Sequence, residues 1–272
     1  MEISAHALWP FVWLLLASGL VSGLVAGLLG VGGGIVLVPV LYHVFSGVGI
    51  DADLRMHLSV GTSLATVVFT ATRSALAHRS LGALDGALLR AWGPPAVLGA
   101  VVGAVVAPRL GDQQLGEVFA SVALVVALHM AFAKESWRLA TQPPRGVGRY
   151  ALGSLVGALS VGMGLGGGTL GVPIFTLVGV PVHRAVGTAA GLGVLIAAPG
   201  LLGFLLSGHG VPGRPPGCVG YVNLLAVALL APTSVLAVPL GARLAHGLSR
   251  RALRRAFALF LVVTAWRMFV AG

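Results

Sequence analysis

The sequence predicts an all-α polytopic membrane protein with about eight transmembrane helices, arranged as two homologous four-helix halves. Hydrophobic residues make up 57% of the chain and charged residues only 9%, whereas roughly 25% of the residues of a soluble globular protein are charged. The chain also contains 41 glycines, which membrane helices tolerate better than soluble helices do. This composition excludes an ordinary soluble domain and a disordered chain.

The individual helices follow from the positions of the charged residues. Uncharged windows occupy residues 3–50, 56–72, 91–108, 118–133, 150–183, 185–213 and 215–242. A further apolar stretch, 253–271, is interrupted only by arginines near its two ends. Since a transmembrane helix needs about 20 mostly apolar residues, each window accommodates one span. The apolar residues recur with a helical period, so a β-barrel is not expected.

The chain contains an internal repeat. Residues 19–40 align without a gap on residues 153–174, and the likeness resumes where Val60-Gly61-Thr62 matches Val186-Gly187-Thr188. Such self-similarity indicates a duplicated structural unit. We therefore expect a first repeat at 1–133, a polar linker at 134–149 and a second repeat at 150–272.

A GxGGG motif occurs at the same place in both repeats. Its glycines are Gly30, Gly32, Gly33 and Gly34 in the first repeat, and Gly164, Gly166, Gly167 and Gly168 in the second. Each glycine costs a helix about 1 kcal/mol relative to alanine, so the first helix of each half should break here and restart as a short helix at 35–44 and 169–178. Interrupted helices in corresponding places indicate a transporter's binding site, and the N-terminus of a restarted helix attracts an anion. We predict that these glycines bind the substrate.

The alternative role of these glycines is to let helices cross closely. That role is favoured for the GxxxG-type series Gly19, Gly23, Gly27 and the pair Gly153, Gly157. For the consecutive glycines, functional unwinding is favoured. No Gly-Lys-Ser/Thr sequence follows either run, which argues against a nucleotide-phosphate loop.

A few polar side chains lie inside the predicted spans. Thr62 and Ser63 start the second span, and Thr188 lies at the matching place in the sixth. A membrane Ser or Thr often bonds the carbonyl four residues earlier in its own helix, but the matched positions favour a substrate contact. Arg184 could offer an anion a charge-assisted hydrogen bond, or its side chain could extend to the membrane surface. His57 and His183 also match and are expected to be solvated at the interface.

The remaining composition excludes several other classes of protein. The formal net charge is +10, but the basic residues lie between spans, where they anchor helices, so nucleic acid is not an expected partner. Cys218 is the single cysteine, and the histidines lack metal-ligand spacing, so neither a metal site nor a cofactor is expected. No basic residue precedes the first apolar run, so the first helix is expected to be retained. The expected partners are the lipid bilayer and a small anion. A homo-oligomer is possible, and the sequence does not decide whether one forms.

The relative direction of the two halves depends on how often each half crosses the membrane. Four crossings per half give parallel halves, whereas a fifth crossing, made by the short helix after the glycines, would invert the second half. The window at 150–183 is short for two crossings. We therefore favour four crossings and parallel halves.

These motifs resemble those of the TauE/SafE family of bacterial membrane transporters, also called the sulfite exporter family. The resemblance rests on the paired GxGGG motifs with a following Val-Pro, the paired Val-Gly-Thr elements, and the loop formed by His78, Arg79, Gly82 and Asp85. It covers residues 14–269 and implies export of small sulfur-containing anions, such as sulfite or organosulfonates, across the bacterial inner membrane. In the second half, Asn223 replaces the acid found at Asp85.

Three functions compete on this basis. A secondary transporter of small anions explains both the duplication and the two glycine breaks. A membrane-embedded enzyme would need a nucleophile with its base, or a metal cluster, inside the bilayer, and the sequence offers neither. A non-transporting subunit or assembly factor of a larger membrane complex would not need matched helix breaks.

Overall fold

The computed structural model describes residues 5–132, 143–245, 262 and 266, and within them the chain is almost entirely helical. The first half contains α1 (Ala5–Leu29), α2 (Gly34–Gly47), α3 (Ala52–Ser80), α4 (Gly86–Val106), the short 3₁₀ helix η1 (Ala107–Arg109) and α5 (Asp112–Phe132). The second contains α6 (Val147–Gly162), α7 (Gly168–Leu177), α8 (Val182–Ser207), a small hairpin of β1 (Cys218–Val219) and β2 (Val222–Asn223), and α9 (Leu224–Leu244). The predicted all-α class is confirmed.

Among the described helices, four are long and apolar enough to cross a membrane. They comprise Trp9–Leu29 of α1, Gly86–Arg109 of α4 and η1, Val182–Ser207 of α8 and Leu224–Leu244 of α9. Most of the expected linker 134–149 and nearly all of the expected last span 253–271 lie outside the described residues. α6 begins at Val147, slightly before the expected boundary at residue 150. The count of eight spans therefore stays a prediction.

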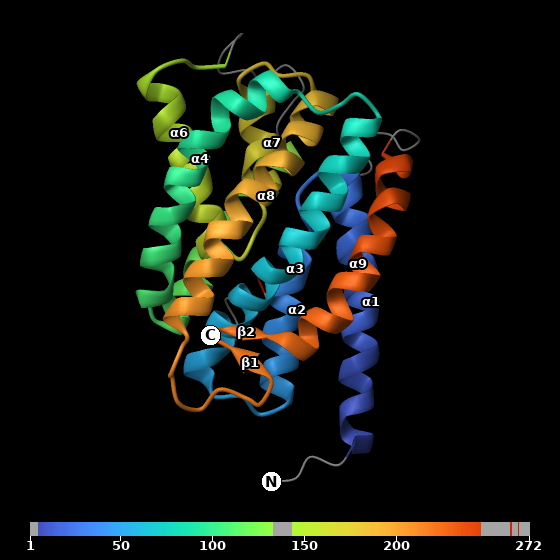
Figure 1. Cartoon of the computed structure of the whole chain (residues 1–272), viewed down its shortest axis with the longest axis vertical. Helices are drawn as coiled ribbons and strands as arrows, with labels where there is room; N and C mark the ends of the chain where they lie inside the picture. Colours follow the sequence, from blue (N-terminus) through green and yellow to red (C-terminus); the bar gives the residue numbers. More distant parts are fainter. Residues whose placement is uncertain (1–4, 133–142, 246–261, 263–265, 267–272) are drawn as a thin grey trace.

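Both predicted helix breaks are present, but α2 does not continue in the direction of α1. The N-terminal end of α2 lies against Ser22, and its last residue, Gly47, lies against Phe11, so α2 folds back along α1 (Figure 1). Gly30, Gly32 and Gly33 all have positive φ angles, which glycine adopts without steric cost. These three residues allow the chain to reverse between the helices.

The matched helices α3 and α8 run antiparallel. Leu64 of α3 lies against Gly200 of α8, whereas the later residue Ala71 lies against the earlier residue Gly193. The expectation of parallel halves is therefore wrong. The physical reason is the fold-back of α2, because an additional reversal in the first half leaves the second half starting in the opposite direction (Figure 1).

The glycine series outside the breaks serve helix packing, as predicted. A methyl group at Gly23 or Gly27 of α1 would overlap backbone carbonyl oxygens of α9, at Ser234 and Val238. A methyl group at Gly157 of α6 would likewise overlap a carbonyl of α4. α1 with α9 and α4 with α6 are accordingly closely packed helix pairs.

Candidate functional site: two helix breaks that meet

The two glycine breaks meet in the buried centre of the protein. The first break, residues 30–33, separates α1 from α2, and the second, residues 163–167, separates α6 from α7. A methyl group at Gly168, the first residue of α7, would overlap the carbonyl oxygen of Gly30. A methyl group at Gly34, the first residue of α2, would overlap the carbonyl oxygen of Gly164. Each short helix therefore starts against the break of the opposite half.

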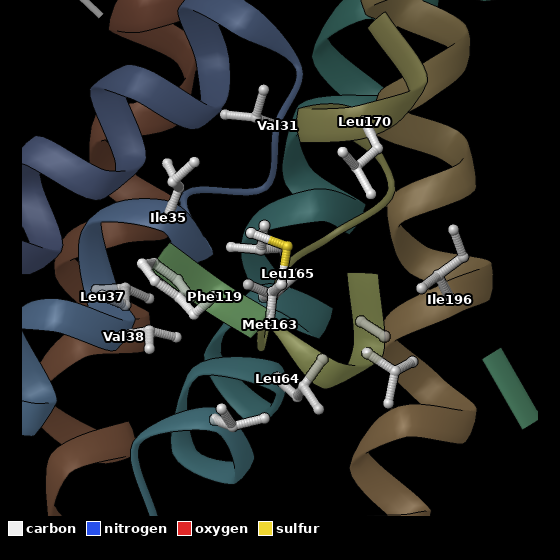
Figure 2. Packing of buried hydrophobic residues seen from close by; sticks show 14 of the residues in the cluster. Val31, Ile35, Leu37, Val38, Leu64, Phe119, Met163, Leu165, Leu170 and Ile196 are labelled. Atoms are coloured by element: carbon white, nitrogen blue, oxygen red, sulfur yellow. The ribbon is translucent and has the colours of Figure 1, made fainter. Parts of the chain in front are cut away.

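Buried apolar side chains surround this meeting point. Val31 and Leu165, one from each break, lie in one cluster with Ile35 of α2 and Leu170 of α7 (Figure 2). The first-turn N–H groups of a helix lack intrahelical partners and carry its positive dipole end. Since α2 and α7 both begin here, the arrangement brings two such helix ends into one apolar surrounding, where their attraction for an anion is strongest.

A row of polar side chains on α3 bonds backbone carbonyl groups at the breaks and in the last turn of α1. Ser63 donates to the Gly164 carbonyl at 2.7 Å, and Thr70 donates to the Gly32 carbonyl at 2.7 Å. Further along the same helix, Ser74 donates to the Ala26 carbonyl and His78 Nε2 to the Gly27 carbonyl, both at 3.0 Å. The hydroxyl of Ser22 of α1 bonds the Gly33 carbonyl at 3.1 Å. These bonds explain how irregular backbone is stable at this depth.

The second break has fewer such bonds. The positions of α8 that match Ser63 and Thr70 are the apolar residues Ala189 and Ile196. In contrast, Ser160 of α6 and Thr169 of α7 are buried, and their hydroxyl groups have no hydrogen-bond partner in the described part of the chain. Since a buried polar group without a partner costs about 1–3 kcal/mol, these two hydroxyls are candidate ligand contacts.

Sequence reasoning missed Ser160 and Thr169, although a signal for both was present. Thr169 directly follows the second glycine run, and Ser160 lies one helical turn before it. It also missed Ser22, Thr70 and Ser74, and it placed His78 in a loop, whereas His78 is a buried residue in the last turn of α3. The spacing of Ser63, Thr70, Ser74 and His78 along one apolar span could have indicated a polar face on that helix.

The structure brings the predicted glycines and Ser63 together but gives the predicted threonines another contact. Thr188 accepts a hydrogen bond from the backbone N–H of Asp85, and Thr62 accepts one from the backbone N–H of Asn223. Both threonines are fully buried. Each hydroxyl keeps its own proton available for donation, so a substrate contact stays a prediction for both.

Arg184 lies apart from the buried breaks. Its guanidinium group pairs with the carboxylate of Asp85, and its side chain is 56% exposed. The pKa of Asp85 lies below its usual value, chiefly because the carboxylate accepts a hydrogen bond from the Leu88 backbone N–H, with a further contribution from Arg184. The structure therefore places Arg184 in an ion pair at the start of α4.

The expectation of a solvated His57 is wrong. Its side chain is buried, and Nδ1 lies 2.8 Å from a carboxylate oxygen of Asp112. The same carboxylate accepts the backbone N–H groups of Met56 and His57. Asp112 therefore joins the start of α5 to the first turns of α3, and the His57 ring packs against that of Tyr221, with the centroids 4.8 Å apart. His183, at the matching position, is exposed.

Comparison with known proteins adds an independent line of evidence. A family model described as "Sulfite exporter TauE/SafE" matches residues 15–268. A "Probable membrane transporter protein" of Haemophilus influenzae is 33% identical over 260 residues, covering 96% of this chain and 98% of the relative. Proteins described in the same words from Methanocaldococcus jannaschii and Bacillus subtilis are 25% and 24% identical, covering 89% and 95% of this chain and 89% and 97% of the respective relatives. No solved structure matches the chain.

Proposed function

Because the chain belongs to the TauE/SafE sulfite exporter family of membrane transporters, we propose that it is a secondary transporter that exports small anions, such as sulfite or an organosulfonate, across the bacterial inner membrane. The observation that carries this proposal is the meeting of the two helix breaks. Two helix N-termini from oppositely directed halves converge on one buried point. Discontinuous helices at the interface of inverted repeats are the usual setting for an anion site in transporters.

In this proposal, the anion is bound only by hydrogen-bond donors. The first-turn N–H groups of α2 and α7 point their positive dipole ends at the substrate, and the hydroxyls of Thr169 and Ser160 supply hydrogen bonds. Gly30, Gly32, Gly33 and Gly34 with Gly164, Gly166, Gly167 and Gly168 provide the close backbone approach. Thr62, Ser63 and Thr188 on the adjoining helices complete the proposed contacts. Arg184, paired with Asp85 near the surface, would act in attracting the anion.

The structure has this centre closed, because Gly168 packs directly on the Gly30 carbonyl. A substrate can enter only if the two breaks separate. Movement of one half against the other would separate them and would expose the centre to one membrane face at a time. Thr70 of α3 bonds the first break at Gly32, and Ser63 of α3 bonds the second break at Gly164, so we expect opening to break at least one of these two hydrogen bonds.

A non-transporting membrane subunit is the alternative function. Such a subunit gains nothing from two unwound segments that need a dedicated row of hydroxyl groups on α3. The transporter therefore accounts for more of the described structure. A membrane-embedded enzyme is disfavoured by the family and by the transporter names of the relatives.

The test is substrate efflux from proteoliposomes. Purified protein is reconstituted into vesicles loaded with radiolabelled sulfite or a radiolabelled organosulfonate, and loss of label is followed against protein-free vesicles. We expect protein-dependent efflux that Thr169→Val slows, while Thr72→Val, an exposed threonine bonded within its own helix, leaves it unchanged. Absence of efflux for all anions tested, from a protein that is folded and correctly inserted, would contradict the proposal.

A further inference from the structure

A large cavity opens at one end of the helix bundle, away from the glycine breaks. Its volume is about 750 Å³, within the range of roughly 300–1,000 Å³ that is usual for small-molecule sites. α1, α2, the start of α3, the loop before the hairpin and the start of α9 form its walls. The apolar part of the wall includes Phe11, Leu15, Phe45, Leu225 and Leu229.

The cavity lies at the level of the membrane surface. Trp9 and Trp13 of α1 are 54% and 66% exposed, and they flank Phe11 on the same helix. Exposed tryptophans gather where the hydrocarbon core meets the headgroups. A cavity at this depth, lined by apolar side chains of the spanning helices α1 and α9, is suited to hold part of a phospholipid.

Two opposite charges at one end of the cavity belong to no ion pair in the described part of the chain. Asp51 and Arg55 both line it and lie four residues apart, a spacing that commonly pairs side chains on a helix. The described ion pairs nevertheless include neither residue. Arg55 instead donates through Nε to the Ile50 carbonyl at 2.7 Å, which leaves the rest of its guanidinium available. Asp51 precedes α3 but makes no side-chain hydrogen bond to cap it.

We propose that this cavity binds one phospholipid with a primary-amine headgroup, a phosphatidylethanolamine. Arg55 binds the phosphate through a charge-assisted hydrogen bond, Asp51 accepts from the ammonium group, and the apolar wall covers the upper part of an acyl chain. A phosphate and an ammonium group on one headgroup match one arginine and one aspartate. A choline headgroup has no N–H to donate to Asp51. The proposal is independent of the transported substrate.

Photo-crosslinking of the full chain in vesicles tests this site. A phosphatidylethanolamine with a photoreactive acyl chain is incorporated at trace level, and labelled peptides are mapped after illumination. We expect labelling within residues 11–15 and 225–229, displaced by unlabelled phosphatidylethanolamine but not by phosphatidylcholine. Labelling confined to other surfaces, or equal displacement by both lipids, would overturn the proposal. Stronger displacement by phosphatidylglycerol would assign the site to an anionic lipid instead and would also overturn it.

Matched variants separate the two contacts. Arg55→Gln should reduce labelling about tenfold, the effect of losing a charge-assisted bond, whereas Arg109→Gln should not, because Arg109 lies outside the cavity. Asp51→Asn should remove the preference for ethanolamine over choline, whereas Asp53→Asn, an exposed carboxylate in the same turn, should keep it. Leu229→Trp should reduce labelling by filling the cavity. The lipid site would be refuted if both variants of a pair had equal effects. It would also be refuted if residues 11–15 and 225–229 cross-linked to a second copy of the chain in place of lipid.

Discussion

The backbone N–H of Asp85 donates a 3.1 Å hydrogen bond to the hydroxyl of Thr188, which belongs to the opposite half of the chain. Asn223, which matches Asp85 in sequence, donates in the same way to Thr62 at 3.0 Å. Asp85 and Asn223 also cap α4 and α9 with their side chains. The start of one helix in each half is therefore held by a buried threonine of the other half, so the paired bonds connect the halves twice.

Replacing Thr62 or Thr188 by valine should destabilise the protein. Valine leaves the backbone N–H of Asn223 or Asp85 without its acceptor, at a cost of about 1–2 kcal/mol for each substitution. Thr72→Val is the control, because the Thr72 hydroxyl bonds the Val68 carbonyl of its own exposed turn. Unfolding midpoints in detergent micelles measure the difference.

The same two variants test the predicted substrate contact. If each hydroxyl also donates its proton to the anion, apparent affinity in proteoliposomes should weaken by about 1 kcal/mol per substitution. Lower stability with unchanged affinity would leave both threonines with a purely structural role. If neither the stability nor the apparent affinity changed, the two hydrogen bonds between the halves would be contradicted as well.

Adding one methyl group at Gly168 should stop transport without preventing membrane insertion. Its φ angle is not in the left-handed region, so alanine fits the backbone, but the methyl group would overlap the Gly30 carbonyl. Overpacking of this kind costs about 1–3 kcal/mol and displaces the N-terminus of α7 from the position in which it would bind the anion. Gly86→Ala is the matched control, because Gly86 also begins a helix and has nothing within 4 Å of an added methyl group. Normal flux in both variants would show that the close approach is dispensable.

The helix breaks could be predicted from the sequence, whereas the fold-back of α2 could not. Three nearly consecutive glycines in an apolar run are a local signal, and the structure ends α1 at Leu29 and begins α2 at Gly34. The direction taken after a break depends on the φ angles of Gly30, Gly32 and Gly33. Glycine permits either sign of φ, so packing decides the direction. The lengths of the uncharged windows favour parallel halves, but they contain no information about the direction of α2.

The site could be predicted only in part for a similar reason. The repeat alignment identified the glycines, Thr62 and Thr188 as matched, but it could not show that each threonine bonds the opposite half. Thr169 and Ser160 have no matching hydroxyl in the first half, where Ile35 and Ala26 stand. A search for symmetric features therefore passes over them. The apolar sequence around Arg184 makes it a candidate for the anion site. Its ion-pair partner Asp85 is 99 residues away in the chain, so this pairing could not be predicted from the local sequence.

Asp85→Asn should have little effect on stability at neutral pH. Asparagine at the matching position already caps α9, where the Asn223 side chain accepts the Ala226 N–H at 2.9 Å. The ion pair that is lost joins Asp85 to a largely exposed Arg184, and such pairs contribute less than about 1 kcal/mol. We therefore expect normal folding and transport.

The pH dependence of this variant provides a sharper measurement. The folded pKa of Asp85 is lowered, so its carboxylate stabilises the protein above the unfolded value of about 3.9. This stabilisation is lost as the pH falls through the lower folded pKa. The melting temperature of the wild type should approach that of Asp85→Asn as the pH falls below about 4. A constant difference across this range would show that the Asp85 carboxylate contributes nothing through its charge.

The described acidic residues bear on how transport is energised. A coupling proton or cation is usually bound by a carboxylate within the membrane. Asp51, Asp85 and Asp112 instead lie where α3, α4 and α5 begin. Asp85 is paired with Arg184, and Asp112 with His57. None of them belongs to the converging glycine breaks, so the proposed anion site contains no acid to carry a coupling proton.

We therefore predict electrogenic anion efflux, driven by the membrane potential and the substrate gradient. An anion that leaves a compartment with a negative interior gains about 2.3 kcal/mol per charge for each 100 mV, so export needs no coupling ion. In proteoliposomes with the potential clamped by potassium and valinomycin, reversal of the potential should reverse the favoured direction of flux, and Asp85→Asn should behave as the wild type. A flux that ignored the potential but followed an imposed pH gradient would contradict this prediction. It would direct attention to His57 and Asp112, whose side chains form a buried pair 2.8 Å apart, and Asp112→Asn would then be expected to abolish the pH response.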